Sequence, residues 1–289
     1  MRKFFSIFIS LCVIYTIDVH SQSLPVFNRV DSLMLAGSFF QASIECDRVM
    51  FNSDSMELNR IALLKKAYAQ KSMGNYEKAI ELLTQFRPAN NHQDSLWVVK
   101  FSELALCHFL DKNFESSLAA LAGIRNESIK SEQFYDIRLL KIVNLNSLYR
   151  FEEAKELMES AFVDCHLDCS QVDMIYRKRY LPKRRNPETA KNLSMIIPGS
   201  GHVYSGRFGE GGINFLLNAG ALSFGVYHIY YGYFFSGYVI GFTLLHKFHS
   251  GGMHRAEILA EAKNLRDMTR FNESVINCFN RNRKIVLMD

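Results

Sequence analysis

Proline and strand-like alternation are both scarce in this chain of 289 residues. Only five prolines interrupt it, and few segments alternate apolar and polar residues as a half-buried strand does. The frequent Leu, Ala, Glu and Lys residues favour helices instead. We therefore predict an all-α protein, with room for one large or two smaller domains.

The glycine-rich stretch IIPGSGHVYSGRFGEGGINFLLN, residues 196–218, lacks the residues of a nucleotide site. A phosphate-binding loop needs a lysine and then a serine or threonine after its last glycine. Arg207 and Phe208 follow Gly206 instead. A dinucleotide fingerprint needs a third glycine where Tyr204 stands. An enzyme that uses Cys165, His166 and Asp168 is an alternative, but these residues lie within one helical turn and no nucleophile motif surrounds them. We therefore expect a non-enzymatic protein without a cofactor.

Charged residues are absent from residues 211–246, a run of 36 rich in Phe, Leu, Ile, Val and Tyr. One membrane span takes about 20 residues, so the run suits two short helices joined by a turn near residues 230–233. We therefore predict a glycine-rich loop and a membrane hairpin over residues 193–252. Tyrosines cluster at the turn, as in the aromatic belts at membrane surfaces: Tyr227, Tyr230, Tyr231 and Tyr233.

Small residues recur at helical spacing on both arms of this hairpin. Gly237 and Gly241 form a G-x-x-x-G step on the second arm, and Ala221 and Gly225 form the matching step on the first. Such steps let helix backbones approach closely in membranes. An antiparallel pair folded about Tyr231 would set Gly225 against Gly237 and Ala221 against Gly241.

Two asparagines, Asn214 and Asn218, lie one turn apart within the apolar first arm. Polar groups are costly in lipid, so we expect them to face protein, capping the glycine loop or bonding the second helix. Binding of a solute or ion is the alternative. The remaining candidate positions lie in the loop before the hairpin: Gly199, Gly201, Tyr204 and Gly206.

A fourfold repeat occupies the first half of the chain. The segments AGSFFQASIE, SMGNYEKAIE, LDKNFESSLA and LYRFEEAKEL share an aromatic residue, spaced by 37, 38 and 37 positions, and a small residue three positions later. The aromatics are Phe39, Tyr76, Phe114 and Phe151, and the small residues are Ala42, Ala79, Ser117 and Ala154. The pattern predicts stacked helix hairpins whose small residues allow close packing.

The repeat resembles the tetratricopeptide repeat family, best in KKAYAQKSMGNYEKAIELLTQFRP, where Gly74, Tyr76, Ala79 and Pro88 fall near consensus positions. The resemblance covers roughly residues 28–165. It implies a curved stack of helix pairs whose concave surface binds a peptide or protein partner. A spacer role is the alternative. We assign residues 22–165 to this stack.

The loop and hairpin also resemble a known element. PGSGHVYSGRFGEGGINFLLN is similar to the P-G-x-G-x-x-Y-x-G element that precedes an apolar hairpin in uncharacterised bacterial membrane proteins. It is more loosely similar to the two-transmembrane-helix domain. The resemblance implies that the protein resides in a membrane, and it implies no known catalytic or binding activity.

The start of the chain has the pattern of an export signal. Two basic residues precede an apolar run at residues 4–17, and compact residues stand at Val19 and Ser21. We predict a signal peptide over residues 1–21 and a place in the bacterial cell envelope, at either membrane. An uncleaved anchor is the alternative.

Export would place the cysteines in a compartment that permits disulfides. Cys165 and Cys169 could pair with each other, bind a metal together with His166, or remain thiols. Their spacing is not one of the strong metal or redox signatures, so we predict no metal site.

Positive charge is concentrated in the predicted linker, residues 166–192. Its cations are Arg177, Lys178, Arg179, Lys183, Arg184 and Arg185. No recognised nucleic-acid-binding fold surrounds them, and a position before an apolar region favours lipid phosphates. Beyond the hairpin, residues 253–289 predict an amphipathic helix that packs on the repeats or lies on the membrane.

These patterns together predict a membrane-anchored scaffold or adaptor that binds a protein partner through its repeats and lipid through its hairpin. The alternative is a module that handles a small solute or ion through the hairpin, with the repeats as a regulatory cap. No nucleic-acid partner is expected, and the sequence does not determine the oligomeric state.

Overall fold

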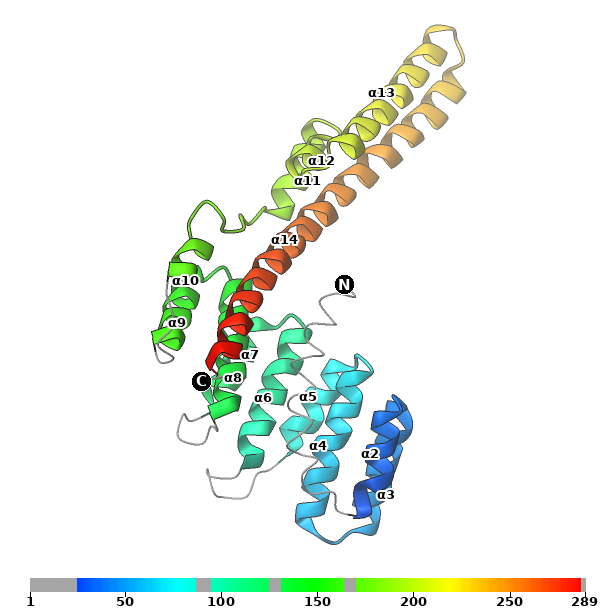
Figure 1. Ribbon diagram of the computed structural model, residues 1–289. Coiled ribbons are helices and arrows are strands. Elements are labelled where there is room, and N and C mark those ends of the chain that lie inside the picture. Colours follow the sequence, from blue (N-terminus) through cyan, green and yellow to red (C-terminus); the bar gives the residue numbers. More distant parts are fainter. Residues whose placement is uncertain (1–24, 87–94, 125–130, 164–169, 287–289) are drawn as a thin grey trace. The chain divides into compact units, whose positions relative to one another are not determined.

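The computed structural model describes residues 25–86, 95–124, 131–163 and 170–286 (Figure 1). Every regular element in these residues is a helix, so the prediction of an all-α chain is confirmed for the described part. The predicted signal peptide and the pair Cys165 and Cys169 lie outside the described residues. The chain divides into two compact units, Met1–Tyr176 with Val275–Asp289, and Arg177–Ser274.

The first unit contains successive helix pairs, which follow a short 3-10 helix, η1 at Pro25–Phe27. The pairs are α2 Asn28–Leu35 with α3 Phe39–Asn52, α4 Met56–Ser72 with α5 Tyr76–Gln85, α6 Ser95–Leu110 with α7 Phe114–Ala122, and α8 Ser131–Ser147 with α9 Phe151–Val163. Each helix from α2 to α9 packs against the next along the chain. The second helix of every pair begins at the aromatic residue that recurs in the sequence.

The small residues of the repeat are completely buried. Ala42, Ala79, Ser117 and Ala154 each have no exposed surface. The one serine among them is satisfied, because its hydroxyl donates to the carbonyl oxygen of Ala105 at 2.7 Å. A larger side chain at these positions would push the paired helices apart.

The turn inside every helix pair has the same backbone geometry. Two positions before the recurring aromatic, the chain enters the left-handed region at Gly37, Gly74, Lys112 and Tyr149. The first helix of each pair then ends in a Schellman motif with the same two hydrogen bonds. In the third pair, for example, the N–H of Lys112 donates to Phe109 O at 3.0 Å and the N–H of Asn113 donates to His108 O at 2.8 Å.

Buried ion pairs join the first helices of successive pairs. Lys65 on α4 pairs with Asp31 on α2, and Lys71 on α4 pairs with Glu103 on α6. Both lysine side chains are almost fully buried. Removing one partner of such a pair would leave an uncompensated charge in the interior.

The last part of the chain completes the first unit. Helix α14, Phe242–Val286, enters this unit at Val275. The ring of Phe279 lies 6.3 Å from that of Tyr135 and 6.1 Å from that of Phe162. From Val275 onward, the amphipathic tail therefore packs on the repeats, which was one of the two arrangements that the sequence left open.

The second unit begins with the basic segment and two short helices, α11 Pro187–Ile196 and α12 Ser200–Tyr204. Helix α13, Phe208–Tyr230, then runs out to a turn, and the chain returns through the π-helix η3, Ser236–Gly241, and the start of α14. The returning arm lies antiparallel beside α13 (Figure 1). The hairpin is thus present, and the predicted boundary after residue 252 falls inside α14.

Candidate functional site

The base of the hairpin is closed by three glycines, Gly199, Gly201 and Gly211, which we call the glycine clasp. Gly199 adopts a φ of +88°. A Cβ atom on Gly199 would overlap the carbonyl group of Gly211, and one on Gly201 would overlap the carbonyl oxygen of Ala190. A Cβ on Gly211 would lie 2.7 Å from Gly199 O. Only glycine therefore allows α11, α12 and the start of α13 to approach this closely.

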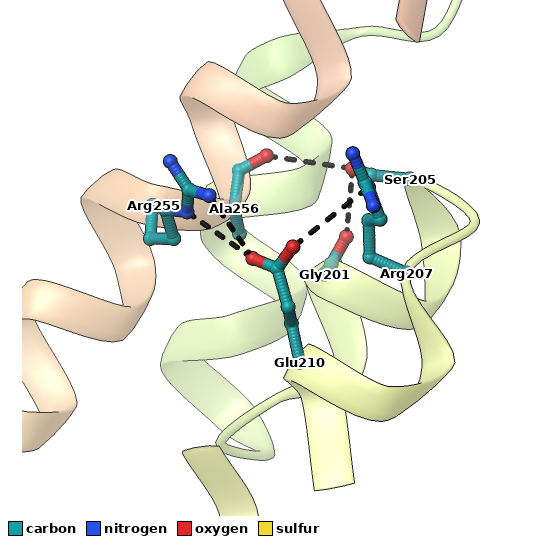
Figure 2. A network of polar contacts seen from close by, with 6 residues as sticks. All are labelled: Gly201, Ser205, Arg207, Glu210, Arg255 and Ala256. Atoms are coloured by element: carbon teal, nitrogen blue, oxygen red, sulfur yellow. Dashed lines mark hydrogen bonds and ion pairs between the residues drawn. The ribbon is translucent and has the colours of Figure 1, made fainter. Parts of the chain in front are cut away.

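Hydroxyl groups satisfy the backbone of the clasp. The Ser205 hydroxyl donates to Gly201 O at 2.9 Å and lies 3.4 Å from Ala256 O on α14 (Figure 2). The N–H of Gly201 donates to the Ser194 hydroxyl at 3.1 Å. These bonds tie α12 to α11 on one side and to α14 on the other.

A charged group of three residues lies beside the clasp. Glu210, near the start of α13, is 3.2 Å from Arg255 on α14 and 3.8 Å from Arg207 (Figure 2). All three side chains are partly exposed, so the ion pairs contribute little stability on their own. They mark the place where the charge-free part of the hairpin begins.

The predicted loop residues Tyr204 and Gly206 both belong to this base. The Tyr204 hydroxyl accepts from the N–H of Asn186 at 3.3 Å, and its ring packs on the buried alanines of α11 and α14. Gly206 has a φ of +78° with open space around it. Its glycine is required by backbone conformation rather than by a close contact.

A buried histidine in the clasp was not singled out by the sequence. His202 on α12 is almost fully buried, and its Nδ1 atom has no hydrogen-bond partner in the described part of the chain. Burial lowers the pKa of His202; Glu210 raises it and Arg255 lowers it. The clasp therefore favours the neutral imidazole.

The two arms of the hairpin meet at the predicted small residues. A Cβ on Gly241 would lie 2.6 Å from Gly225 Cα, and one on Gly237 would lie 3.0 Å from Gly225 O. Ala221 is buried, and its carbonyl oxygen lies 3.8 Å from the same Cβ position on Gly241. Gly225 thus faces both glycines of the second arm, with Ala221 beside Gly241.

The asparagines continue the same inner face of α13. The side-chain amide of Asn214 donates to Phe248 O on α14 at 3.4 Å, and that of Asn218 donates to Asn214 O at 2.8 Å. A Cβ on Gly252 would overlap the side-chain amide of Asn214, which would have to move to admit it. The buried Oδ1 atom of Asn218 has no partner among the described residues.

Beyond Glu210, most of the exposed side chains on the remaining circumference of α13 are apolar, and Ser223 is an exposed polar residue among them. Leucine, isoleucine, valine and aromatic side chains project on every side of the helix other than the inner face of glycine, asparagine and alanine. Examples that together circle the helix are Ile213, Phe215, Leu216, Leu217, Leu222 and Val226. The exposed apolar surface continues over the turn and onto the second arm through Tyr231, Tyr233, Phe234, Phe235, Tyr238 and Phe242.

Within the residues that the structure describes, no helix combines the length and the apolar character needed to cross a membrane. The predicted pair of membrane-crossing helices is therefore not confirmed. The asparagines, the histidine and the glycines of α13 dilute its apolar content.

The predicted basic residues lie on the segment that leads into α11. Five of them are exposed: Arg177, Lys178, Arg179, Lys183 and Arg184. The sixth, Arg185, lies over the Tyr204 ring with its guanidinium carbon 5.6 Å from the ring centroid. The backbone of Arg185 is held on both sides by the Asn264 amide of α14, at 2.8 Å and 2.7 Å. The end of the basic segment is thus fixed to the base of the hairpin.

The described residues contain no group of three His, Cys, Asp or Glu side chains that could hold a metal ion. Comparisons with protein-family models, curated proteins and solved structures find no match to this chain.

Proposed function

We propose that the chain is a non-enzymatic adaptor of the bacterial cell envelope, which binds a protein partner through its helical repeats and holds it at a membrane. The hairpin of α13 and α14 enters the lipid bilayer from one face, without either helix crossing it. The basic segment lies among the headgroups.

The observation that carries this proposal is the distribution of apolar side chains around α13. A docked protein covers one stripe of a helix, and the rest of such a helix is polar. Here exposed apolar side chains from Ile213 to the turn lie in directions all around the outer face, with Ser223 as an exposed polar exception. A fluid apolar medium covers all sides at once, so lipid suits this surface better than a single protein partner.

Exposed aromatic and basic side chains would both contribute to membrane association. Phe234 and Phe235 at the turn are 66% and 79% exposed, and burying a side chain of this size contributes about 2 kcal/mol. Each cation near an anionic surface adds about 1 kcal/mol, and five of the predicted basic residues are exposed. The turn and the basic segment together contribute about 9 kcal/mol, which lies within the range of about 4 to 15 kcal/mol that association costs.

Binding of a partner by the repeats is supported by the stack of helix pairs. Its test requires the full chain, because Phe279 of α14 packs on Tyr135 and Phe162. A fragment that ends after the repeats would expose this apolar contact. Affinity capture with the full chain should retain a partner that is lost when surface residues of α4 and α6 are replaced.

Flotation with phospholipid vesicles tests the membrane part. Replacing both Phe234 and Phe235 by serine should reduce vesicle binding on the order of 100-fold, since each tenfold step corresponds to about 1.4 kcal/mol. The matched control replaces Phe40 and Phe51 on α3, which are 68% and 91% exposed, by serine. Equal binding by both double variants and the wild-type protein would contradict the proposal.

A second candidate function is supported by the unpartnered Oδ1 atom of Asn218. A buried acceptor without a donor fits a module that handles a small solute or ion, with the repeats as a regulatory cap. This reading requires that Asn218→Leu abolishes solute or ion flux in proteoliposomes while leaving the helix content unchanged. Unchanged flux, or no flux in the wild-type protein, would remove this candidate.

A further inference from the structure

Large exposed apolar side chains in the helical repeats gather on the first helix pair. On α3, Phe40, Ile44 and Phe51 are 68%, 44% and 91% exposed. Just before and just after this helix, Leu35 and Met56 are 81% and 78% exposed. Beyond Met56, the described side chains of α4 to α9 include no other large apolar group that is exposed. The outer face of α3 therefore differs from the rest of the stack.

The other helix pairs have glutamate where α3 has apolar side chains. The position after the recurring aromatic residue is Phe40 in the first pair and glutamate in the next three, at Glu77, Glu115 and Glu152. Four positions later, Ile44 corresponds to Glu81, Ala119 and Glu156. The residues of the three later pairs are all exposed. Because apolar side chains replace charged ones at equivalent exposed positions, the outer face of α3 is suited to contact with another surface.

The opposite end of the stack is already covered. Phe279 of α14 packs against Tyr135 and Phe162 of the last pair. Helix α3 packs against α2 and α4, but its outer face remains open to solvent. Because the terminal pairs of a repeat stack need a polar or covered outer face, the first pair requires a partner.

The exposed positions of α3 are arranged symmetrically. Phe40, Ile44, Asp47 and Phe51 are four, three and four residues apart, so they share one face of the helix. We call these four residues the α3 stripe. Reversing the direction of the helix exchanges Phe40 with Phe51 and leaves the spacing unchanged. Such a stripe is complementary to a second copy of itself across a two-fold axis, a property that binding to a different protein does not require.

We propose that two copies of this chain pair through their α3 stripes in antiparallel orientation. Phe40 of each copy packs against Phe51 of the other, and Ile44 lies opposite Asp47. The Asp47 carboxylate is already paired with Lys66 of its own chain at 2.6 Å, so it enters the contact with its charge compensated. Lipid is a poorer cover, because a charged group within the stripe would have to enter hydrocarbon.

The ends of the stripe extend the same symmetry. Leu35 precedes the stripe by as many residues as Met56 follows it. In an antiparallel pair, Leu35 of each copy is therefore level with Met56 of the other. The contact thus includes five exposed apolar side chains from each copy.

The size of this contact predicts its strength. Ten side chains of this kind bury on the order of 1,000 Å² in total, which is near the lower limit for a specific protein interface. Interfaces of this size form reversible complexes, so we expect a dissociation constant in the micromolar range. At nanomolar concentration the chain is then monomeric, and vesicle binding measured there does not depend on this contact.

Sedimentation equilibrium of the full-length protein, in a mild detergent matched to the solvent density, tests the proposal. The double variant Phe40→Glu with Ile44→Glu should raise the dissociation constant on the order of 100-fold or more, because charges replace central apolar contacts on both copies. The matched control adds two charges elsewhere, with Ala119→Glu on α7 and Ser160→Glu on α9, which are both exposed. It should dimerise like the wild-type protein, and circular dichroism should show equal helix content in all three proteins.

Cross-linking through introduced cysteines tests the antiparallel orientation. Under mild oxidation, Phe40→Cys combined with Phe51→Cys should form more covalent dimer than the wild-type protein, because each new thiol meets the other across the interface. Phe40→Cys alone should not, since the two copies of this residue lie at opposite ends of the contact. The two positions are eleven residues apart on one helix, about 16 Å, which is too far for a disulfide within one chain.

The outcomes separate this inference from the proposed function. A wild-type protein that stays monomeric well above micromolar concentration would overturn the α3 contact. Equal dimerisation of the wild-type protein and the double glutamate variant would also overturn it, since the dimer would then form through another surface such as the hairpin. Cross-linking of Phe40→Cys alone as strong as that of the double cysteine variant would overturn the antiparallel orientation. A protein that dimerises through α3 but binds no vesicles would contradict only the membrane proposal.

Discussion

The contact between Gly241 and Gly225 allows a direct test of how the hairpin arms pack. We predict that Gly241→Ala forces the arms apart. The new Cβ would lie 2.6 Å from Gly225 Cα and 3.2 Å from Gly225 N, whereas carbon atoms pack best at about 3.5 to 4.0 Å. Because both atoms belong to the backbone, no side chain can rotate away to relieve the overlap.

The size of the effect is the difference between two opposing contributions. Inserting a methyl group into a packed interface costs about 1 to 3 kcal/mol. Replacing glycine by alanine within a helix returns about 0.5 to 1 kcal/mol. The two ranges leave a net destabilisation of the hairpin of up to about 2.5 kcal/mol for Gly241→Ala, centred near about 1 kcal/mol.

Gly220→Ala is the matched control, because Gly220 lies in the middle of α13 with nothing within 4 Å of its Cβ position. It should stabilise the helix by about 0.5 to 1 kcal/mol. Hydrogen exchange of the α13 amides, followed by mass spectrometry in mild detergent, measures both changes as opening free energies. If Gly241→Ala protects these amides as well as Gly220→Ala does, the arms are not held by the glycine contact.

Two further predictions concern the helix turns and the clasp. Lys112→Gly should raise the free energy of unfolding by about 1 kcal/mol, because Lys112 has a φ of 64° and a left-handed conformation is unfavourable for residues with a Cβ. Gly74→Ala should lower the free energy of unfolding by a similar amount. A denaturant titration measures both changes. Burial lowers the pKa of His202, so the folded state takes up a proton less readily than the unfolded state. The folded state therefore loses stability relative to the unfolded state as the pH falls below about 6.5. His202→Gln should therefore reduce the loss of stability between pH 7 and 5, measured by thermal unfolding, and an unchanged pH profile would exclude His202 as its source.

The repeat shows which features of the fold a sequence can reveal. The recurring aromatic residues predict where α3, α5, α7 and α9 begin, because they stand at a fixed position of the helix pair. The left-handed turns at Lys112 and Tyr149 were not predictable. Glycine marks the corresponding position in the first two pairs, but the last two pairs form the same two backbone hydrogen bonds without a glycine.

The hairpin was predictable where the reasoning depended on local spacing. The steps Ala221 to Gly225 and Gly237 to Gly241 predict Gly225 against Gly237, whereas the structure places Gly225 beside both glycines and nearest to Gly241. The clasp required contacts between distant residues, such as Ser205 with Ala256, and spacing along the chain contains no information about them. A run without charges likewise identifies an apolar segment, but it does not determine whether each helix is apolar enough to cross a membrane.

The continuity of α14 through residue 252 was also not predictable from the sequence, because it depends on a contact between distant residues. The predicted boundary after residue 252 lies beside Gly251 and Gly252, yet both are helical. A Cβ on Gly252 would meet the side-chain amide of Asn214 on the opposite arm, so Asn214 would have to move. A glycine that accommodates a neighbour cannot be told from a glycine that ends a helix until the neighbour is known.

The lack of side chains where the two arms touch also makes the helix pair narrow. With only hydrogen atoms between Gly225 and Gly241, the two backbones form a thinner rod than helices separated by leucines. Any medium must open a hole to admit such a rod, and the work of opening that hole grows with the surface of the hole. The small diameter of the helix pair thus lowers the free-energy cost of making room for it in any medium, independently of how its outer side chains interact with that medium.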